Sequence, residues 1–412
     1  MDDNSNPGVF EDEEINEDDI AEVIEIEDGE AENLDDLTEE VGDVDFEHYD
    51  GDDGEDEAMA EMEELPDDAE VCFKGHSASL FSCDVDPTTS TLAVTGGEDD
   101  RAFVWTLANG QNLFECTGHK DSVTCVCFNH DSSMVATGDM SGLIKVWKVE
   151  TKTEIWSFEC ADLEWLSWHH AANVLLAGTA DGDIWMWKIP SGEFKTMQGP
   201  RCQTTTGKVF PDGKRCCAGY EDGSIRIWDL KETSVLQTFT AHTGHSGGIT
   251  SLDCHSDGSL LVSGSTDSTA KLLNSNTGKV IATFAAGPAA SEDESNSVEA
   301  VAFCKSQPLV AVGSLNGIVG LWDIPTQIQR NQCKHEAGIV RVVWDATNPL
   351  VYTCCLDGVV RLWDGRSGQV VSKWTGHMGE ILDMAITRDG NSIVTASGDK
   401  TARVFAVHKP DR

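Results

Sequence analysis

The sequence predicts an all-β fold, an eight-bladed β-propeller that follows a long, acidic and disordered N-terminal tail. Three observations indicate this architecture. Short segments of alternating apolar residues recur at a nearly constant period, a turn-forming residue precedes the end of each segment, and nearly half of all acidic residues lie in the first 70 positions.

Tryptophan marks the period. Six segments end in Trp; the long gap before Trp322 leaves room for one further unit and the stretch after Trp363 for another, with Leu273 and Phe405 in the marker position. The six tryptophans are Trp105, Trp147, Trp187, Trp228, Trp322 and Trp363. The eight markers are separated by 42, 40, 41, 45, 49, 41 and 42 residues, a spacing that suits four short strands per unit.

Turn chemistry precedes every marker. Asp-Gly pairs such as Asp181-Gly182 are typical of tight hairpin turns. The turn-formers stand six positions before the markers and are Asp99, Ser141, Asp181, Asp222, Asp267, Asn316, Asp357 and Asp399. Five units carry a His 28 or 29 positions before the marker, namely His76, His119, His245, His335 and His377.

These residues, together with WD dipeptides such as Trp228-Asp229 and Trp363-Asp364, resemble the WD-repeat family from about residue 69 to the end. In that family the His, a Ser or Thr, the turn Asp and the Trp form a buried, hydrogen-bonded tetrad that fixes each blade. The resemblance implies one complete tetrad of His76, Thr95, Asp99 and Trp105.

The same resemblance implies further tetrads. One contains His119, Thr137 and Trp147, and Ser141 in its turn weakens it. The other implied members are His245, Asp267, His335, Asp357, Trp363, His377 and Asp399.

Longer strings resemble one branch of the family. They include VTGGEDDRAFVW ending at Trp105 and ATGDMSGLIKVW ending at Trp147. This resemblance implies a cytoplasmic protein-interaction scaffold or adaptor, peripheral at the cell membrane, in cell migration and angiogenesis signalling. It also implies kinship with a fungal eight-bladed chaperone that holds a basic ribosomal protein for large-subunit assembly. Adaptor and ribosomal-protein chaperone both stay open.

The ends of the repeat predict how the ring closes. Val71–Phe73 precedes the first unit and has no blade of its own, while the last unit, ending at 405–407, is one strand short. Pairing the two completes the eighth blade and leaves no open sheet edge.

Charge divides the chain into two parts. Residues 1–70 hold 34 of the 73 acidic residues and no Lys or Arg, which leaves a net charge of −11 for the remainder. Such a segment repels itself and has too few apolar residues to fold. We therefore expect a disordered tail over residues 1–68 and a propeller over residues 69–412. The negative charge favours basic protein partners over nucleic acid, whose phosphates the tail would repel.

Catalytic, cofactor and metal sites are not predicted. Gly244–Gly248 matches the GxSxG nucleophile elbow, but His245 is in register with the repeat histidines and a strand pattern follows it. The 14 cysteines form no CxxC pair, and no apolar run is long enough to span a membrane. A monomeric, non-enzymatic cytoplasmic protein with reduced thiols is expected.

Partner-binding residues are expected in the turns of one rim. The acidic candidates are Glu98, Asp100, Asp121, Asp162, Glu164, Glu221, Glu336 and Glu380. Two positions before the marker, five units have Lys or Arg, whereas two have the aromatic residues Phe103 and Trp185. These are either exposed anchors or residues packed against an adjacent blade. Ser291, in an acidic insertion, is a candidate phosphorylation site.

Overall fold

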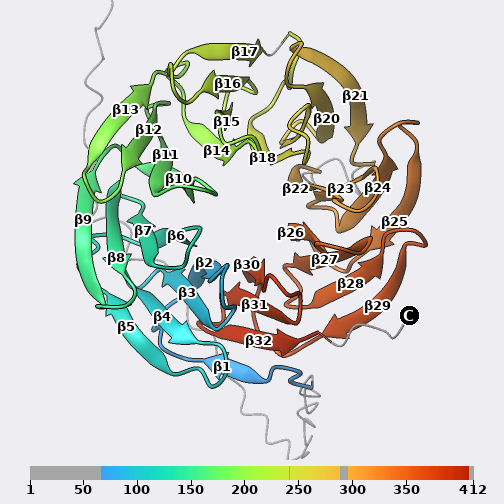
Figure 1. Cartoon of the computed structure of the whole chain (residues 1–412). Coiled ribbons are helices and arrows are strands. Elements are labelled where there is room, and N and C mark those ends of the chain that lie inside the picture. Colours follow the sequence, from blue (N-terminus) through green and yellow to red (C-terminus); the bar gives the residue numbers. More distant parts are fainter. Residues whose placement is uncertain (1–65, 241, 288–295, 408–412) are drawn as a thin grey trace, which may run out of the picture. The chain divides into compact units, whose positions relative to one another are not determined.

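The computed structural model describes residues 66–240, 242–287 and 296–407, and these form an eight-bladed β-propeller (Figure 1). The described residues build 32 strands and no helix, arranged as eight four-stranded antiparallel sheets around a central axis. The predicted fold class is therefore confirmed for this part of the chain. Residues 1–65 of the predicted tail and Ser291 lie outside the described residues, whereas residues 66–68, which the sequence assigns to the tail, are described.

Each of blades 1 to 7 uses four consecutive strands, called a to d from the axis outward. Blade 1 contains β2 (Leu80–Val85), β3 (Leu92–Gly97), β4 (Ala102–Thr106) and β5 (Asn112–Cys116). Blade 2 contains β6 (Val123–Phe128), β7 (Met134–Asp139), β8 (Leu143–Lys148) and β9 (Thr153–Glu159). Blade 3 contains β10 (Leu163–Trp168), β11 (Val174–Thr179), β12 (Ile184–Lys188) and β13 (Glu193–Met197). Blade 4 contains β14 (Thr204–Val209), β15 (Arg215–Tyr220), β16 (Ile225–Asp229) and β17 (Val235–Phe239).

The remaining blades follow the same order. Blade 5 contains β18 (Ile249–Cys254), β19 (Leu260–Ser265), β20 (Thr269–Asn274) and β21 (Lys279–Ala285). Blade 6 contains β22 (Val298–Phe303), β23 (Leu309–Ser314), β24 (Ile318–Asp323) and β25 (Gln329–Lys334). Blade 7 contains β26 (Ile339–Trp344), β27 (Leu350–Cys355), β28 (Val360–Asp364) and β29 (Gln369–Trp374). Blade 8 contains β30 (Ile381–Ile386), β31 (Ser392–Ser397), β32 (Ala402–Ala406) and β1 (Val71–Phe73).

The core lies between neighbouring blades. The b strands are buried on both faces, as in β7, where all six residues are buried. All eight predicted markers lie on c strands, and Trp105 and Trp187 are fully buried. One cluster joins Val94 and Val104 of blade 1 to Val126 and Val135 of blade 2, so each blade is covered by the next.

Blade 8 closes the ring as the sequence predicts. Strand β1 pairs antiparallel with β32, so that Val71 faces Val404 and Phe73 faces Ala402. Phe73 also stacks on Trp105 of blade 1 with the ring centroids 4.8 Å apart. One strand from the beginning of the propeller thus completes the last sheet and packs on the first.

The residues before β1 are also attached to blade 8. The backbone N–H of Asp68 donates to the Thr375 carbonyl at 2.9 Å, and the Thr375 N–H donates to the Asp68 carboxylate at 2.8 Å. Asp67 forms an ion pair with Arg403. Burial raises the pKa of Asp67, but hydrogen bonds from Arg403 and the Ala69 N–H outweigh it and hold that pKa below its usual value.

Strand direction divides the turns between two rims. Because the strands are antiparallel, the a–b and c–d turns leave the sheet at one end, here called the lower rim. The b–c turns and the d–a connections between blades meet at the other end, the upper rim. In the part of the chain that the structure describes, no helix is long and apolar enough to cross a membrane.

Candidate protein-interaction surface

Hydrogen bonds join the d–a connection to the b–c turn of blade 1. His76 Nδ1 lies 2.9 Å from Asp99 Oδ1 and donates to it, so Nε2 accepts from the Thr95 hydroxyl at 3.0 Å. The Trp105 Nε1–H donates to the same Thr95 oxygen at 3.3 Å. Burial lowers the pKa of His76, which keeps the ring neutral at physiological pH.

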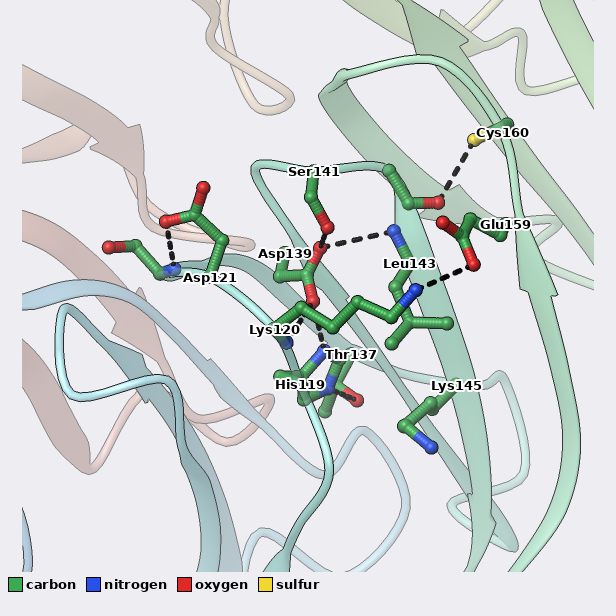
Figure 2. A network of polar contacts seen from close by, with 12 residues as sticks. His119, Lys120, Asp121, Thr137, Asp139, Ser141, Leu143, Lys145, Glu159 and Cys160 are labelled. Atoms are coloured by element: carbon green, nitrogen blue, oxygen red, sulfur yellow. Dashed lines mark hydrogen bonds and ion pairs between the residues drawn. The ribbon is translucent and has the colours of Figure 1, made fainter.

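Blade 2 makes the corresponding contacts with a different carboxylate (Figure 2). His119 donates to Asp139 at 3.0 Å and accepts from Thr137 at 2.8 Å, and the Trp147 indole donates to Thr137 at 3.0 Å. The expectation that Ser141 weakens this tetrad was wrong. Asp139 supplies the missing carboxylate from the end of β7, and the Ser141 hydroxyl donates to it at 2.7 Å.

Asp139 is strongly ionised in this position. Burial raises its pKa, but hydrogen bonds from His119, the Lys120 N–H and the Ser141 hydroxyl outweigh burial and bring the pKa to about 2. The carboxylate therefore anchors both the d–a connection, through His119 and Lys120, and the b–c turn, through Ser141 and the Leu143 N–H at 3.1 Å.

Two other blades make the contacts without an indole. His245 lies 3.0 Å from Asp267 and 2.8 Å from the Ser263 hydroxyl. His377 lies 2.8 Å from Asp399 and 2.7 Å from the Thr395 hydroxyl. Their markers, Leu273 and Phe405, have no side-chain N–H that could donate to the hydroxyl.

Blade 7 departs from the expected pattern. His335 accepts from Thr353 at 2.8 Å, and the Trp363 indole donates to Thr353 at 3.0 Å, but His335 Nδ1 donates to the Gly317 carbonyl at 3.2 Å instead of to Asp357. The expectation that His335 contacts Asp357 was wrong, because the buried Arg361 guanidinium pairs with the Asp357 carboxylate at 2.7 Å. Burial, together with the Arg361 charge, lowers the pKa of His335 to about 4.

The eight acidic candidates share the upper rim, since each lies in a b–c turn, a d–a connection or the first residues of an a strand. Glu164 on β10 is half-buried, and the other seven are exposed. Two use a carboxylate oxygen locally: Glu98 accepts the Ser79 N–H at 3.3 Å, and Asp121 accepts the Ser122 N–H at 2.7 Å. None of the eight forms an ion pair with a described residue.

Several cations near this rim are neutralised, in contrast. Lys145 pairs with Glu154 at 2.7 Å, Arg361 pairs with Asp357, and Arg403 pairs with Asp67. Lys120 pairs with Glu159 at 2.8 Å, as Figure 2 shows. Where cations are paired in this way, the free carboxylates beside them make those parts of the upper rim negative.

The two aromatic candidates are packing residues. Phe103 is only 4% exposed and lies edge-on to His76 and Phe73, with centroid distances of 4.7 and 5.8 Å, so its interpretation as an exposed anchor was wrong. Trp185 is half-buried and packs on Phe158 of blade 2, at 5.4 Å. Both rings fill the space between adjacent blades, the alternative that the sequence left open.

Sequence reasoning missed three apolar residues on the upper rim. Met378 is 73% exposed, Met140 is 50% exposed and Leu356 is 38% exposed. All three stand in or beside the turns that otherwise carry polar residues, and this break in the turn pattern was the available signal. Methionine is frequent on adaptable protein-binding surfaces.

The GxSxG match lies in a d–a connection. His245 bonds Asp267 and Ser263, and strand β18 begins at Ile249 directly after the motif. A nucleophile elbow needs a helix at that point to expose its serine.

A ring of four-stranded blades, tied by histidine contacts at one rim, defines a WD-repeat propeller. The family model "WD domain, G-beta repeat" matches seven segments, 69–106, 110–148, 195–229, 233–274, 278–323, 327–364 and 368–405, and the chain belongs to this family. The gap between the second and third segments covers β10–β12 of blade 3, one of the units without the repeat His.

Among curated proteins the chain is similar to angio-associated migratory cell proteins. It is 52% identical to that of Homo sapiens, over 96% of this chain and 95% of the human protein, and 52% identical to that of Canis lupus familiaris. The resemblance of the repeat strings to this branch of the family is therefore confirmed. An alignment of this length also extends into the acidic tail.

Solved structures with the same fold include Sqt1 of two fungi. Sqt1 of Chaetomium thermophilum, bound to the N-terminus of the ribosomal protein L10, has a TM-score of 0.75 at 22% identity and covers 83% of this chain. Sqt1 of Saccharomyces cerevisiae has a TM-score of 0.76 at 20% identity and covers 84% of this chain. Both matches extend over the whole of the Sqt1 chain.

Proposed function

We propose that the protein is a cytoplasmic, monomeric scaffold whose upper rim binds a basic segment of a protein partner. The observation that carries this proposal is the set of eight upper-rim carboxylates, seven of them exposed and none in an ion pair with a described residue. A basic segment would neutralise them, whereas nucleic acid would be repelled. All 14 cysteines are free, which supports a reducing compartment.

Two cellular roles fit a rim of this kind. The similarity to angio-associated migratory cell proteins favours an adaptor in cell migration and angiogenesis signalling, peripheral at the cell membrane. The fold shared with Sqt1, solved with the N-terminus of L10, favours a chaperone that shields a basic ribosomal protein during ribosome biogenesis. In both roles the rim supplies specificity through fixed turns.

Titration with the N-terminal peptide of ribosomal protein L10 from the same organism separates the two roles. Isothermal calorimetry on the full chain should give saturable binding that the triple variant Glu98→Ala, Asp121→Ala, Glu380→Ala weakens about tenfold or more. Glu150→Ala with Glu193→Ala, which removes exposed carboxylates of the lower rim and the outer strands, is the matched control and should bind normally.

Absence of L10 binding would contradict the chaperone role. Affinity capture followed by mass spectrometry, comparing the full chain with the triple variant, then tests the adaptor role. Signalling proteins lost from the variant support it. An unchanged set of partners would contradict binding at the upper rim.

A further inference from the structure

A recess opens on the lower rim, between blades 3 and 4. It has a volume of about 370 Å³, and its apolar wall comes from both blades. Val174 on β11 and Met186 on β12 contribute from blade 3, and Leu230 contributes from the c–d turn of blade 4. Val174 and Met186 are half-buried and pack with Leu230 in one cluster, so the wall is part of the core.

The recess is held open by contacts between the two blades. His169 Nε2, at the a–b turn of blade 3, donates to the Gly213 carbonyl of blade 4 at 2.9 Å. Lys195 lies beside Met186 in the β12–β13 register, and its Nζ donates to the Lys231 carbonyl at 2.5 Å. Both turns are therefore fixed before any ligand arrives.

Lysines surround the mouth. Lys214 and Lys231 line the recess and are exposed. Lys195, on blade 3, donates a hydrogen bond to the Lys231 carbonyl of blade 4. Neither Lys195 nor Lys214 forms an ion pair with a described residue, and Lys231 has only an exposed partner, Glu232, at 3.7 Å.

One carboxylate in the lining, Asp229, offsets part of this positive charge. Asp229 Oδ1 accepts the backbone N–H groups of Lys231 and Glu232 at 2.9 and 2.8 Å, which holds it in the turn. In a propeller whose net charge is negative, the mouth thus presents the ammonium groups of Lys195, Lys214 and Lys231 against the two carboxylates of Asp229 and Glu232.

We propose that this recess binds an acidic segment of a protein partner that carries one apolar side chain. The apolar side chain enters against Val174, Met186 and Leu230, and the neighbouring carboxylates meet Lys214 and Lys231. The requirement for both features gives selectivity, because acidic segments without the apolar residue gain nothing from the wall. The two rims would then hold segments of opposite charge at once.

Fluorescence anisotropy with a labelled synthetic peptide tests the proposal on the full chain. The peptide has one central phenylalanine between runs of aspartate and glutamate, and a second peptide has serine in its place. We expect saturable binding of the first peptide and about tenfold weaker binding, or none, of the second. Lys214→Glu combined with Lys231→Glu should weaken the first peptide about tenfold or more.

Lys373→Glu is the matched control, since it reverses one exposed lysine on β29 of blade 7 and should leave binding unchanged. Met186→Glu places a charge in the wall and should abolish binding; it should also lower the melting temperature, since the wall is part of the core, so binding is measured well below that temperature. Equal binding of the two peptides, equal weakening by Lys373→Glu, or no saturable binding would overturn the proposal. The upper-rim variants should bind this peptide normally, so the two sites can fail independently.

Discussion

His119 and Asp139 are joined at 3.0 Å, although Asp139 stands two positions earlier in its repeat than the turn aspartates of blades 1, 5 and 8. The carboxylate reaches the same histidine nitrogen from the end of β7, and Ser141 at the usual position donates to it. The d–a connection and the b–c turn are therefore tied in blade 2 as firmly as in blade 1. These hydrogen bonds also hold the d–a connection that carries Asp121.

Replacing the Asp139 carboxylate should lower the free energy of unfolding more than replacing the Ser141 hydroxyl. Asp139→Asn should lower the free energy of unfolding by about 2 kcal/mol at pH 7, because charge-assisted hydrogen bonds in a buried site are lost. Ser141→Ala should cost about 0.5 to 1 kcal/mol, since one donor is removed and the carboxylate keeps its other partners. Urea denaturation of both variants measures this. A larger loss for Ser141→Ala would contradict the assignment.

The same pair predicts a dependence on pH. The pKa of Asp139 is lowered from 3.8 to about 2, so its stabilising contribution is present above pH 4 and is lost as the pH falls through about 2. The difference in stability between the native chain and Asp139→Asn should shrink across that range.

Period and turn chemistry were sufficient to predict eight blades and their closure, because each blade depends on local alternation and on a neighbour of the same kind. Individual contacts were less predictable. Asp139 and Arg361 changed two of the implied tetrads. Asp139 reaches its histidine from two positions before the usual turn residue, and Arg361, four positions after Asp357, pairs with that carboxylate. The sequence left open whether Phe103 is an exposed anchor or a packed residue, because the contacts that decide it include Phe73 of the closing strand.

Blade 7 should lose stability as the pH falls. The pKa of His335 is lowered from 6.5 to about 4 by burial and by the Arg361 charge, so its neutral form stabilises the fold fully above pH 6.5, and this is lost as the pH falls through about 4. His335→Gln should therefore lose less stability between pH 6.5 and pH 4.5 than the native chain. His242→Gln, at an exposed position, is the control and should follow the native chain.

Replacing either of two aspartates, which stand at the same position of their a strands, should have opposite effects on stability at pH 8. Asp84 accepts the Phe128 N–H at 2.8 Å, and burial raises its pKa to about 7. Asp253 accepts the Phe303 N–H at 2.8 Å but also pairs with Lys208 at 2.5 Å. Because a raised pKa favours the folded state at low pH and costs stability above about 7, Asp84→Asn should raise stability by about 1 kcal/mol at pH 8.

That gain should fade as the pH falls toward 4, where the native Asp84 is protonated in the folded chain. Asp253→Asn should instead lower stability by about 1 kcal/mol at pH 8, because Lys208 loses its partner. Thermal unfolding at pH 5 and pH 8 distinguishes the two. A loss of stability for both variants at pH 8 would show that Asp84 is ionised without cost.

Ring closure predicts the effect of two truncations. Removing residues 1–65 keeps the contacts of Asp67 and Asp68 with blade 8 and should leave the melting temperature unchanged. Removing residues 1–76 deletes β1 and His76, exposes the β32 edge and uncovers Trp105, and should cost about 3 kcal/mol or more. Equal melting temperatures would contradict the closing role of β1.

The acidic tail and the upper rim should control different rate constants. Residues 1–65 hold 31 of the 34 carboxylates of residues 1–70 and raise the long-range negative potential, so deleting them should slow association with a basic peptide at low salt. The effect should nearly vanish at 1 M salt, where the Debye length is about 3 Å. Surface plasmon resonance on the full and truncated chains measures both rates.

Glu98→Ala with Asp121→Ala and Glu164→Ala should instead speed dissociation at either salt concentration, because these carboxylates act at short range on fixed turns. If deletion of the tail raises affinity, the tail competes with the partner, and its role in capture is wrong.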